Sequence, residues 1–179
     1  IFQGFLGAGK TTFARKLAAE TGAEVLCPDA YCLSYFSQEE YEKDWEKCFS
    51  RAVSLLWKQA EAAVQSGKDV IWDMGFWDRK SRDEARRKNA EMGAEGILYY
   101  LYAPDEILKK RISERKGGVA ENNRRHFDDL RRKFEEPQVD EVFVGIENYE
   151  AGRARCKIGC GLPQSSVASR LTRRKPNLR

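Results

Sequence analysis

Residues 4–11 have the types and spacing that bind phosphate. Their sequence, GFLGAGKT, fits the phosphate-binding loop pattern G-x-x-x-x-G-K-[ST] without a mismatch. Glycines in such a loop let successive backbone N–H groups turn toward one phosphate, while the lysine meets the β and γ phosphates. The threonine hydroxyl that follows is suited to hold Mg²⁺. We therefore predict a nucleotide site made by Gly4, Gly7, Ala8, Gly9, Lys10, Thr11 and Thr12.

Two carboxylates follow short apolar runs and are candidates for chemistry beside that loop. Asp29 comes after residues 24–27, and Asp73 comes after residues 70–72. Asp73 resembles the acid that supports Mg²⁺, together with Thr11, in proteins with a phosphate-binding loop. Asp29 is suited to accept the proton of a substrate hydroxyl, as a general base in phosphoryl transfer. The competing interpretation of Asp29 is a helix N-cap or a turn after a proline.

The residues just after Asp73 bear on the type of reaction. Met74 stands where ATPases of the motor and helicase types commonly place a water-activating Glu, which favours transfer to an acceptor over hydrolysis. Phe76 and Trp77 could line an acceptor pocket, and core packing is an equally good interpretation for at least one of them.

Four arginines are candidates for binding phosphate or substrate, because guanidinium groups bind oxyanions through paired donors. Arg79 and Arg82 follow Asp73 closely, although solvated helix charge is the favoured interpretation for Arg82. Arg111 and Arg115 are four residues apart, so they share one helix face. We expect that face to reach the γ phosphate when residues 116–133, a candidate mobile cover, close over the site.

Short apolar runs alternate with segments of helical period along the chain. Strands are predicted at 24–27, 70–73, 97–102 and 139–146, and helices at 38–66, at 78–92 and from Asp105 onward. Such alternation implies right-handed crossovers and a parallel sheet covered on both faces. The fold class predicted is α/β, a nucleotide-kinase-like P-loop NTPase with three layers and a mostly parallel five-stranded sheet. Its strands carry the phosphate loop and both acids to one edge.

Charge and length divide the chain in two. Of the 179 residues, those from 151 to 179 hold eight Lys or Arg and no acid, so the net charge of +4 leaves −4 for residues 1–150. We predict one domain over 1–147, truncated within its first strand, and a basic, disordered tail over 148–179. The tail is the sole hint of a nucleic-acid partner, which is therefore disfavoured. Five cysteines without a C-x-x-C pair favour the cytoplasm, and no apolar run suggests a membrane span.

Over roughly residues 1–145 the chain resembles the small P-loop kinases related to zeta toxin, chloramphenicol phosphotransferase and the kinase domain of polynucleotide kinase. The resemblance rests on GFLGAGKTT, on residues 27–29, on VIWDMGFW at 70–77 and on FEEP at 134–137. It implies a phosphotransferase using ATP and Mg²⁺, with Asp29 as base and Arg111 and Arg115 as lid arginines. The acceptor expected is a small-molecule hydroxyl. The alternatives are an NTPase acting as a switch and a toxin-like kinase of a metabolite.

Overall fold

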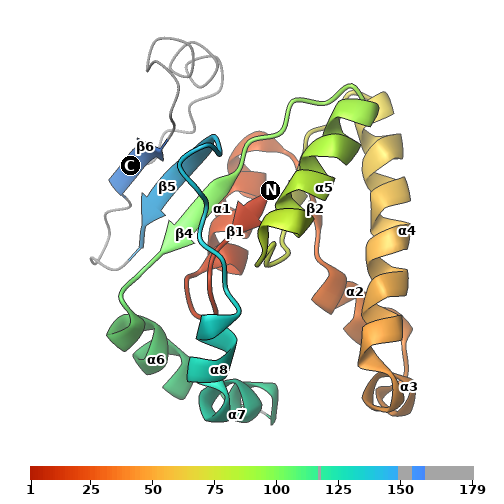
Figure 1. The fold of residues 1–179 in the computed structure, drawn as a ribbon. Helices are drawn as coiled ribbons and strands as arrows, with labels where there is room; N and C mark the ends of the chain where they lie inside the picture. The colour runs from red at the N-terminus through yellow and green to blue at the C-terminus, as the bar shows by residue number, and fades with distance from the viewer. Residues whose placement is uncertain (117, 149–154, 160–179) are drawn as a thin grey trace.

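The computed structural model describes residues 1–116, 118–148 and 155–159 of the chain, in which strands and helices alternate (Figure 1). The strands are β1 (Phe2–Gln3), β2 (Glu24–Leu26), β3 (Val70–Trp72), β4 (Tyr99–Tyr102), β5 (Phe143–Glu147) and β6 (Arg155–Gly159). The helices are α1 (Lys10–Thr21), α2 (Pro28–Tyr35), α3 (Gln38–Lys43), α4 (Trp45–Gln65), α5 (Arg79–Glu91), α6 (Asp105–Ser113), α7 (Gly118–Arg125) and α8 (Phe127–Arg132). No helix in the described part is long and apolar enough to span a membrane.

Parallel pairing dominates the strands. The order in the larger sheet is β1-β4-β5-β6, with β1 and β5 parallel to β4 and with β6 antiparallel to β5. A second ladder pairs β2 with β3 in parallel, and Leu26 lies opposite Trp72. Each parallel step returns through helical segments, as the alternating sequence predicts. The α/β class and the mostly parallel arrangement are confirmed.

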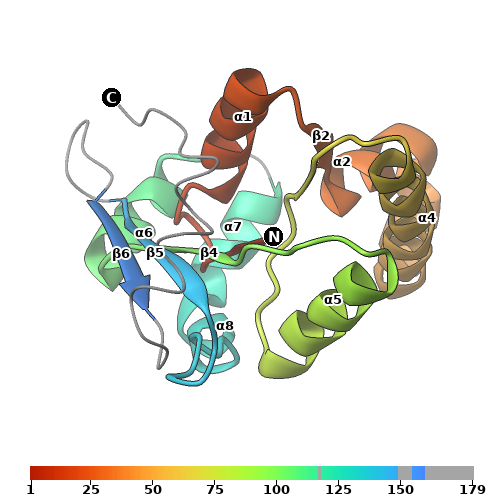
Figure 2. The same ribbon diagram turned by 90° about the horizontal axis from the view of Figure 1, so that it is seen from above.

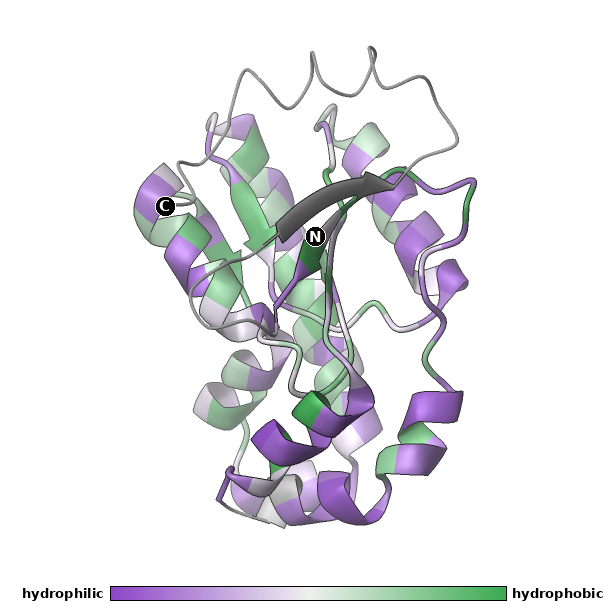
Figure 3. Ribbon diagram, turned by 90° about the vertical axis from the view of Figure 1, so that its left-hand side faces the viewer, coloured by the Kyte–Doolittle hydropathy of each residue, from purple (hydrophilic) through white to green (hydrophobic). Residues whose placement is uncertain are grey.

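The helices surround the strands and bury their apolar residues. In two perpendicular views, α4 and α5 lie side by side at the end of the molecule opposite β5 and β6 (Figures 1 and 2). Hydrophobic residues concentrate on β4 and β5, whereas much of the outer helical surface is hydrophilic (Figure 3). A buried cluster containing Phe2, Phe5 and Leu101 joins β1, the following loop and β4. A second cluster, with Trp72 and Leu56, joins β3 to α4.

The strands differ from the single five-stranded sheet expected. Between the described residues of β1 and β3 there is no ladder, and the β2–β3 pair is separate from the larger sheet. β1 holds two residues, which leaves little backbone to pair along both of its edges. Strand β6 adds a correction, because it lies within the segment 148–179 that we expected to be disordered. Its backbone pairs with β5, with Arg155 opposite Glu147.

The helix predicted over 38–66 is two helices, α3 and α4. Asp44 separates them with φ −154° and ψ 70°, outside the helical region, and its carboxylate accepts a hydrogen bond from Lys47 N at 3.1 Å. Ser37 and Glu40 form a capping box that starts α3. The capping residues Ser37 and Asp44 are both visible in the sequence, but the apolar residues keep a helical period across Asp44 and so predict one continuous helix.

Candidate active site

The loop between β1 and α1 has the conformation of a phosphate cradle. Gly7 and Gly9 have φ values of 81° and 92°, which side chains other than glycine rarely adopt. Gly4 is needed for another reason, since a Cβ there would come within 2.6 Å of the Leu101 carbonyl oxygen. Gly4 and Gly7 therefore determine how the loop packs, and Gly9 precedes the first residue of α1.

The N-terminus of α1 is suited to an anion. Gly9 is the N-cap and has no side chain to cover the first turn, so N–H groups there are left for a ligand. Thr11 and Thr12 are exposed at the same turn. A nucleotide phosphate suits this turn, and a hydroxyl and a carboxylate, as on Thr11 and Asp73, are the kinds of oxygen ligand that Mg²⁺ prefers. Among the described residues there is no cluster of three or more His, Cys, Asp or Glu side chains that could hold a metal ion.

Lys10 lies inside the loop with its ammonium largely buried. Its Nζ donates to the carbonyl oxygens of Gly4, at 2.7 Å, and Phe5, at 3.2 Å. Burial lowers the pKa of Lys10 to about 8, against the opposing attraction of Asp73. An ammonium held by neutral carbonyls next to an anion site can turn to a phosphate, which would restore its full charge.

This pKa predicts that binding of ATP takes up a proton. At pH 8 roughly half of the Lys10 side chains are neutral, whereas a bound phosphate favours the charged form. We expect proton uptake between pH 8 and 9 and weaker ATP binding as the pH rises further. Calorimetry in buffers of different ionisation enthalpy measures the uptake. A Lys10→Arg variant, which stays charged, serves as the control; a wild-type heat independent of the buffer would contradict the assignment.

The two predicted acids lie close to Lys10 and to one another. Asp73 directly follows β3, is 5% exposed, and its backbone N donates to the Leu26 carbonyl of the neighbouring strand at 2.9 Å. Asp29 comes three residues after the end of β2, in the first turn of α2. The N-cap of α2 is Cys27, so the N-cap interpretation of Asp29 is wrong. The parallel register of β2 and β3 is what brings the two carboxylates together.

Asp29 has the electrostatics of a base. Burial of its carboxyl raises its pKa above the ordinary 3.8, the negative charge of Asp73 raises it further, and Lys10 opposes both effects. The residue remains accessible to solvent at the start of α2. A carboxylate with a raised pKa binds a proton more readily than an ordinary aspartate, and its accessibility lets a substrate hydroxyl approach.

Arg111, in the last turn of α6, touches the phosphate loop, whereas Arg115 lies just beyond the end of that helix and not on its face as predicted. Its guanidinium donates to the Gly7 carbonyl at 3.2 Å and to the Asn148 carbonyl at 2.6 Å. Arg115 lies close enough to Lys10 for its charge to lower the lysine pKa. Arg124 of α7 donates to the Arg115 carbonyl at 3.0 Å and so ties the predicted cover to the end of α6. The structure thus brings Arg111 and Arg115 to the loop.

Asn148 is a site residue that sequence reasoning missed. Its Nδ2 donates to the Ala8 carbonyl at 2.8 Å, and its backbone N donates to the Tyr102 carbonyl at 3.1 Å. A Cβ on Gly9 would come within 2.4 Å of that Nδ2. Asn148 follows β5, and the sequence carries no motif there, so we placed it in the tail. The side chain instead holds the phosphate loop against β4.

Arg79 is engaged away from Lys10. Its guanidinium forms paired hydrogen bonds with Asp140, at 2.9 and 3.0 Å, and its Nε donates to Asp83. Its backbone N donates to the Glu135 carboxylate at 2.7 Å. None of these partners belongs to the phosphate loop or is one of the two acids beside it, so we leave Arg79 out of the machinery proposed below.

Arg82 is not a solvated helix charge. Its side chain is fully buried and forms paired hydrogen bonds with Glu141, at 2.8 and 2.7 Å, while a third donor reaches the Glu135 carbonyl. That carbonyl also accepts from Gln3, the residue before the phosphate loop, at 2.7 Å. The ion pair therefore fixes residues 135–141 against β1.

The aromatic pair after Asp73 packs in the core. Phe76 is 3% exposed beside Trp72, with φ 41°, a left-handed conformation unusual for a bulky side chain. Trp77 packs against Phe5 with the rings tilted by 37° and their centroids 5.4 Å apart, and a Cβ on Gly75 would clash with its indole. The turn connecting Asp73 to α5 is thus held tightly beside the phosphate loop.

The fold and this site together define a P-loop protein with the nucleotide-kinase fold. The chain belongs to the protein family described as "AAA domain", whose profile matches residues 1–137. The curated relatives it matches include a shikimate kinase from Caldicellulosiruptor saccharolyticus, 25% identical over 121 residues, which are 64% of this chain and 63% of the relative. The chain thus spans less than two thirds of that relative's length.

Solved structures support the fold. A sugar kinase from Janibacter sp. HTCC2649 superposes with a TM-score of 0.60 at 23% identity, covering 82% of each chain. A gluconokinase from Sinorhizobium meliloti 1021 superposes with a TM-score of 0.58 at 16% identity, covering 82% of this chain and 79% of that one. At these identities the likeness establishes architecture and leaves the acceptor open.

Proposed function

We propose that this protein is an ATP- and Mg²⁺-dependent kinase that transfers the γ-phosphoryl group to a hydroxyl of a small molecule. The observation that carries the proposal is the placement of an accessible carboxylate with a raised pKa, Asp29, beside the lysine of a phosphate-binding loop. A hydrolase needs to position only a water molecule. Asp29 lies on α2, a helix separate from the phosphate loop, which leaves room to hold an acceptor molecule between them. The kinases among the relatives support the same reaction class.

Each residue has a part in this proposal. The loop and the N-terminus of α1 hold the phosphates, and Lys10 neutralises their charge. Thr11 and Asp73 hold Mg²⁺, which when bound neutralises the transferred group. Asp29 takes the proton from the acceptor hydroxyl. Arg111 of α6 and Arg115, just after that helix, supply positive charge as the cover closes.

An NTPase that works as a switch is the second candidate. Met74 disfavours it, because Met74 directly follows Asp73 in the sequence, at the position where motor-type and helicase-type ATPases commonly carry a water-activating Glu. A toxin-like kinase of a metabolite, within the zeta-toxin, chloramphenicol phosphotransferase and polynucleotide kinase group, is a more specific version of the main proposal.

We propose that the partner of this protein is a small-molecule acceptor and not a nucleic acid, and that the protein is located in the cytoplasm. The one hint of nucleic acid, the basic tail, lies mostly outside the described residues.

Replacing Lys10 with Ala tests the proposal. We expect phosphoryl transfer to fall by about three orders of magnitude, because the phosphate charge loses its principal protein counter-charge. The fold should persist, since Lys10 bonds only to carbonyls of its own loop. Transfer is read from ADP produced per acceptor consumed, and circular dichroism checks the fold. Undiminished transfer in a folded variant would refute the proposed site.

A further inference from the structure

Three segments of the chain meet at Asn148, the residue directly after β5. Its backbone N donates to the Tyr102 carbonyl at 3.1 Å and so continues the pairing of β5 with β4. Its own carbonyl accepts a hydrogen bond from the Arg111 guanidinium at 2.6 Å. Its side-chain Nδ2 donates to the Ala8 carbonyl of the phosphate loop at 2.8 Å. The sheet therefore holds Asn148 in place, and Asn148 in turn holds the loop.

The bond to Ala8 sets the direction of the next amide group in the loop. In a planar trans peptide, the C=O and N–H groups point in opposite directions. When the Ala8 oxygen is held against Asn148, the Gly9 N–H is turned to the other side of the loop. Backbone N–H groups turned to one side form the concave surface by which such loops bind phosphate. The Asn148 side chain thus determines where one of these donors points.

Arg111 holds the neighbouring peptide of the loop. Its Nη1 donates to the Gly7 carbonyl at 3.2 Å, so two consecutive carbonyls, those of Gly7 and Ala8, are bound from outside the loop. The fit is close, because a Cβ on Gly9 would come within 2.4 Å of the Asn148 Nδ2. We call Asn148 and Arg111 the loop clamp.

The first carbonyls of the loop have a donor that a nucleotide would take away. Lys10 donates to the Gly4 and Phe5 carbonyls, and in our proposal its ammonium turns to the phosphates. The amide of Asn148 is neutral and has no such second task, so its bond to the loop can persist when the nucleotide binds. A loop rich in glycine otherwise has much conformational freedom, and ordering it on binding weakens the affinity.

We propose that Asn148 is a positioning residue of the nucleotide site, which holds the phosphate loop in its binding conformation before the nucleotide arrives. Asn148 acts through Ala8 and Gly9, and the part of the ligand that it serves is the phosphate chain and not the base. This rests on nucleotide binding by the loop, as in the function proposed above, and it is independent of the acceptor.

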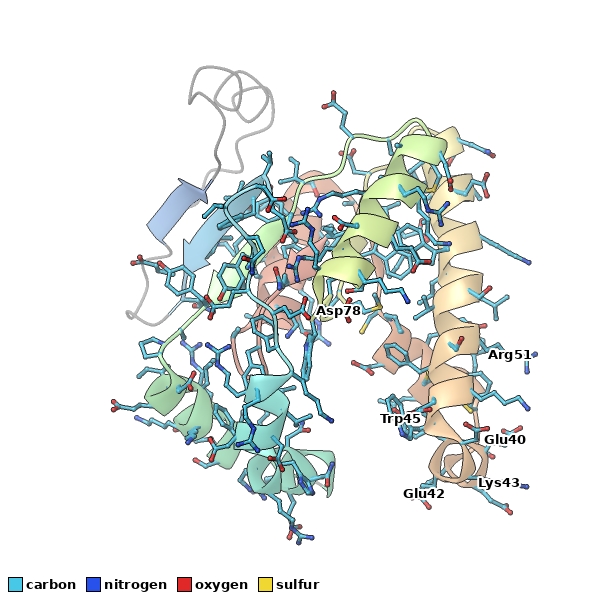
Figure 4. The ribbon with its side chains drawn as sticks, viewed as in Figure 1. Glu40, Glu42, Lys43, Trp45, Arg51 and Asp78 are labelled. Carbon is cyan, nitrogen blue, oxygen red and sulfur yellow. The ribbon has the colours of Figure 1, made fainter. Side chains whose placement is uncertain are left out.

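The loop clamp and the proposed base approach the loop from different sides. Figure 4 labels Glu40 on α3 and Trp45 at the start of α4, and both lie on the side of the molecule opposite β5. The helix α2, which carries Asp29, lies on that side too in both perpendicular views (Figures 1 and 2). A change at Asn148 should therefore affect the nucleotide and leave the binding of the acceptor unchanged.

Nucleotide binding by Asn148→Ala tests the proposal. The variant keeps the backbone of residue 148 and loses the side-chain donor. We expect the Kd for ATP to rise about fivefold to tenfold, the effect of one hydrogen bond, and the Kd for GTP to rise by the same factor. The KM for ATP should rise in proportion, with little change in kcat or in the KM for the acceptor, because the phosphate contact is common to the ground and transition states.

Two further variants sharpen the test. Asn148→Asp keeps the size of the side chain but places a carboxylate oxygen against the Ala8 oxygen, so the loss of ATP affinity should be larger than in Asn148→Ala. Asn89→Ala is the matched control. The Asn89 Nδ2, in the last turn of α5, lies against Gly96 much as the Asn148 Nδ2 lies against Gly9. We expect this control to keep the wild-type affinity for ATP. Calorimetry measures each Kd, and circular dichroism checks each fold.

The outcomes separate this proposal from the kinase function. An ATP affinity unchanged in both Asn148 variants would overturn the proposal, and so would a loss for ATP without an equal loss for GTP, which would indicate a contact with the base. Unfolding of both variants, or an equal loss in Asn89→Ala, would also overturn it. Phosphate release independent of any acceptor, with the loss of ATP affinity still observed, would instead remove the kinase function and leave the loop clamp.

Discussion

Replacing Asp29 with Asn lowers acceptor phosphorylation by about 10²- to 10⁴-fold, the usual contribution of a positioned general base. The amide keeps the size of the side chain but cannot take the proton from the acceptor hydroxyl. The affinity for ATP should change little, because Asp29 enters from α2 and not from the phosphate loop. Single-turnover kinetics of phosphoryl transfer measure the loss, and calorimetry measures the binding of ATP.

A nearby acid provides the control for that experiment. Glu39 is exposed on α3, the helix that follows α2, so Glu39→Gln removes one negative charge at a distance from Lys10. We expect it to retain nearly all activity. Equal losses of activity in Glu39→Gln and Asp29→Asn would contradict the role of Asp29 as a general base, because its effect would then come only from its negative charge. In the wild type, activity should also fall as the pH drops through a pKa above the ordinary 3.8 of an aspartate.

The second large effect concerns stability, through the buried pair of Arg82 and Glu141. Removing the carboxylate in Glu141→Ala leaves a fully buried guanidinium with one ionic partner fewer, which typically costs about 3–5 kcal/mol of unfolding free energy. The neighbouring Asp140→Ala is a matched control, because Asp140 is 63% exposed and pairs with Arg79 at the surface. Such surface pairs contribute about 0–1 kcal/mol. Urea unfolding of both variants measures the difference, and equal losses would contradict the assignment.

The same pair predicts how stability depends on pH. Burial alone would raise the pKa of Glu141, but hydrogen bonds from Arg82 and Arg86 outweigh it and lower the pKa from 4.5 to about 2. The carboxylate is therefore more acidic in the folded state than in the unfolded chain. Its stabilisation is complete above pH 4.5 and is lost as the pH falls toward 2. Glu141→Ala should lack this part of the acid dependence.

The sequence predicted the parts of the site that depend on local pattern. The residues of the phosphate loop are contiguous, so a sequence pattern is enough to find them. The two acids each come at the end of an apolar run that is typical of a strand. Their meeting follows from parallel pairing, which the alternation of strands and helices implies. In the structure the charges of Asp29 and Asp73 both act on Lys10, as parallel pairing suggests.

What the sequence did not predict depends on contacts between distant segments. Asn148 reaches Ala8 across 140 residues, and Arg82 meets Glu141 across 59, so neither role leaves a local pattern. Arg82 sits among charged neighbours that resemble a solvated helix face, and its burial is decided by the segment that packs over it. The strand β6 likewise depends on an available edge of β5, which composition does not reveal.

The fate of the γ-phosphoryl group distinguishes a kinase from an NTPase. Wild-type protein is mixed with radiolabelled ATP and Mg²⁺ in a single turnover, with and without candidate small-molecule acceptors, and the products are separated. We expect the label to appear in an organic phosphate ester only when an acceptor is present, and we expect Asp29→Asn to abolish this product. Label found only in inorganic phosphate, at the same rate with and without acceptors, would contradict this expectation and identify an NTPase.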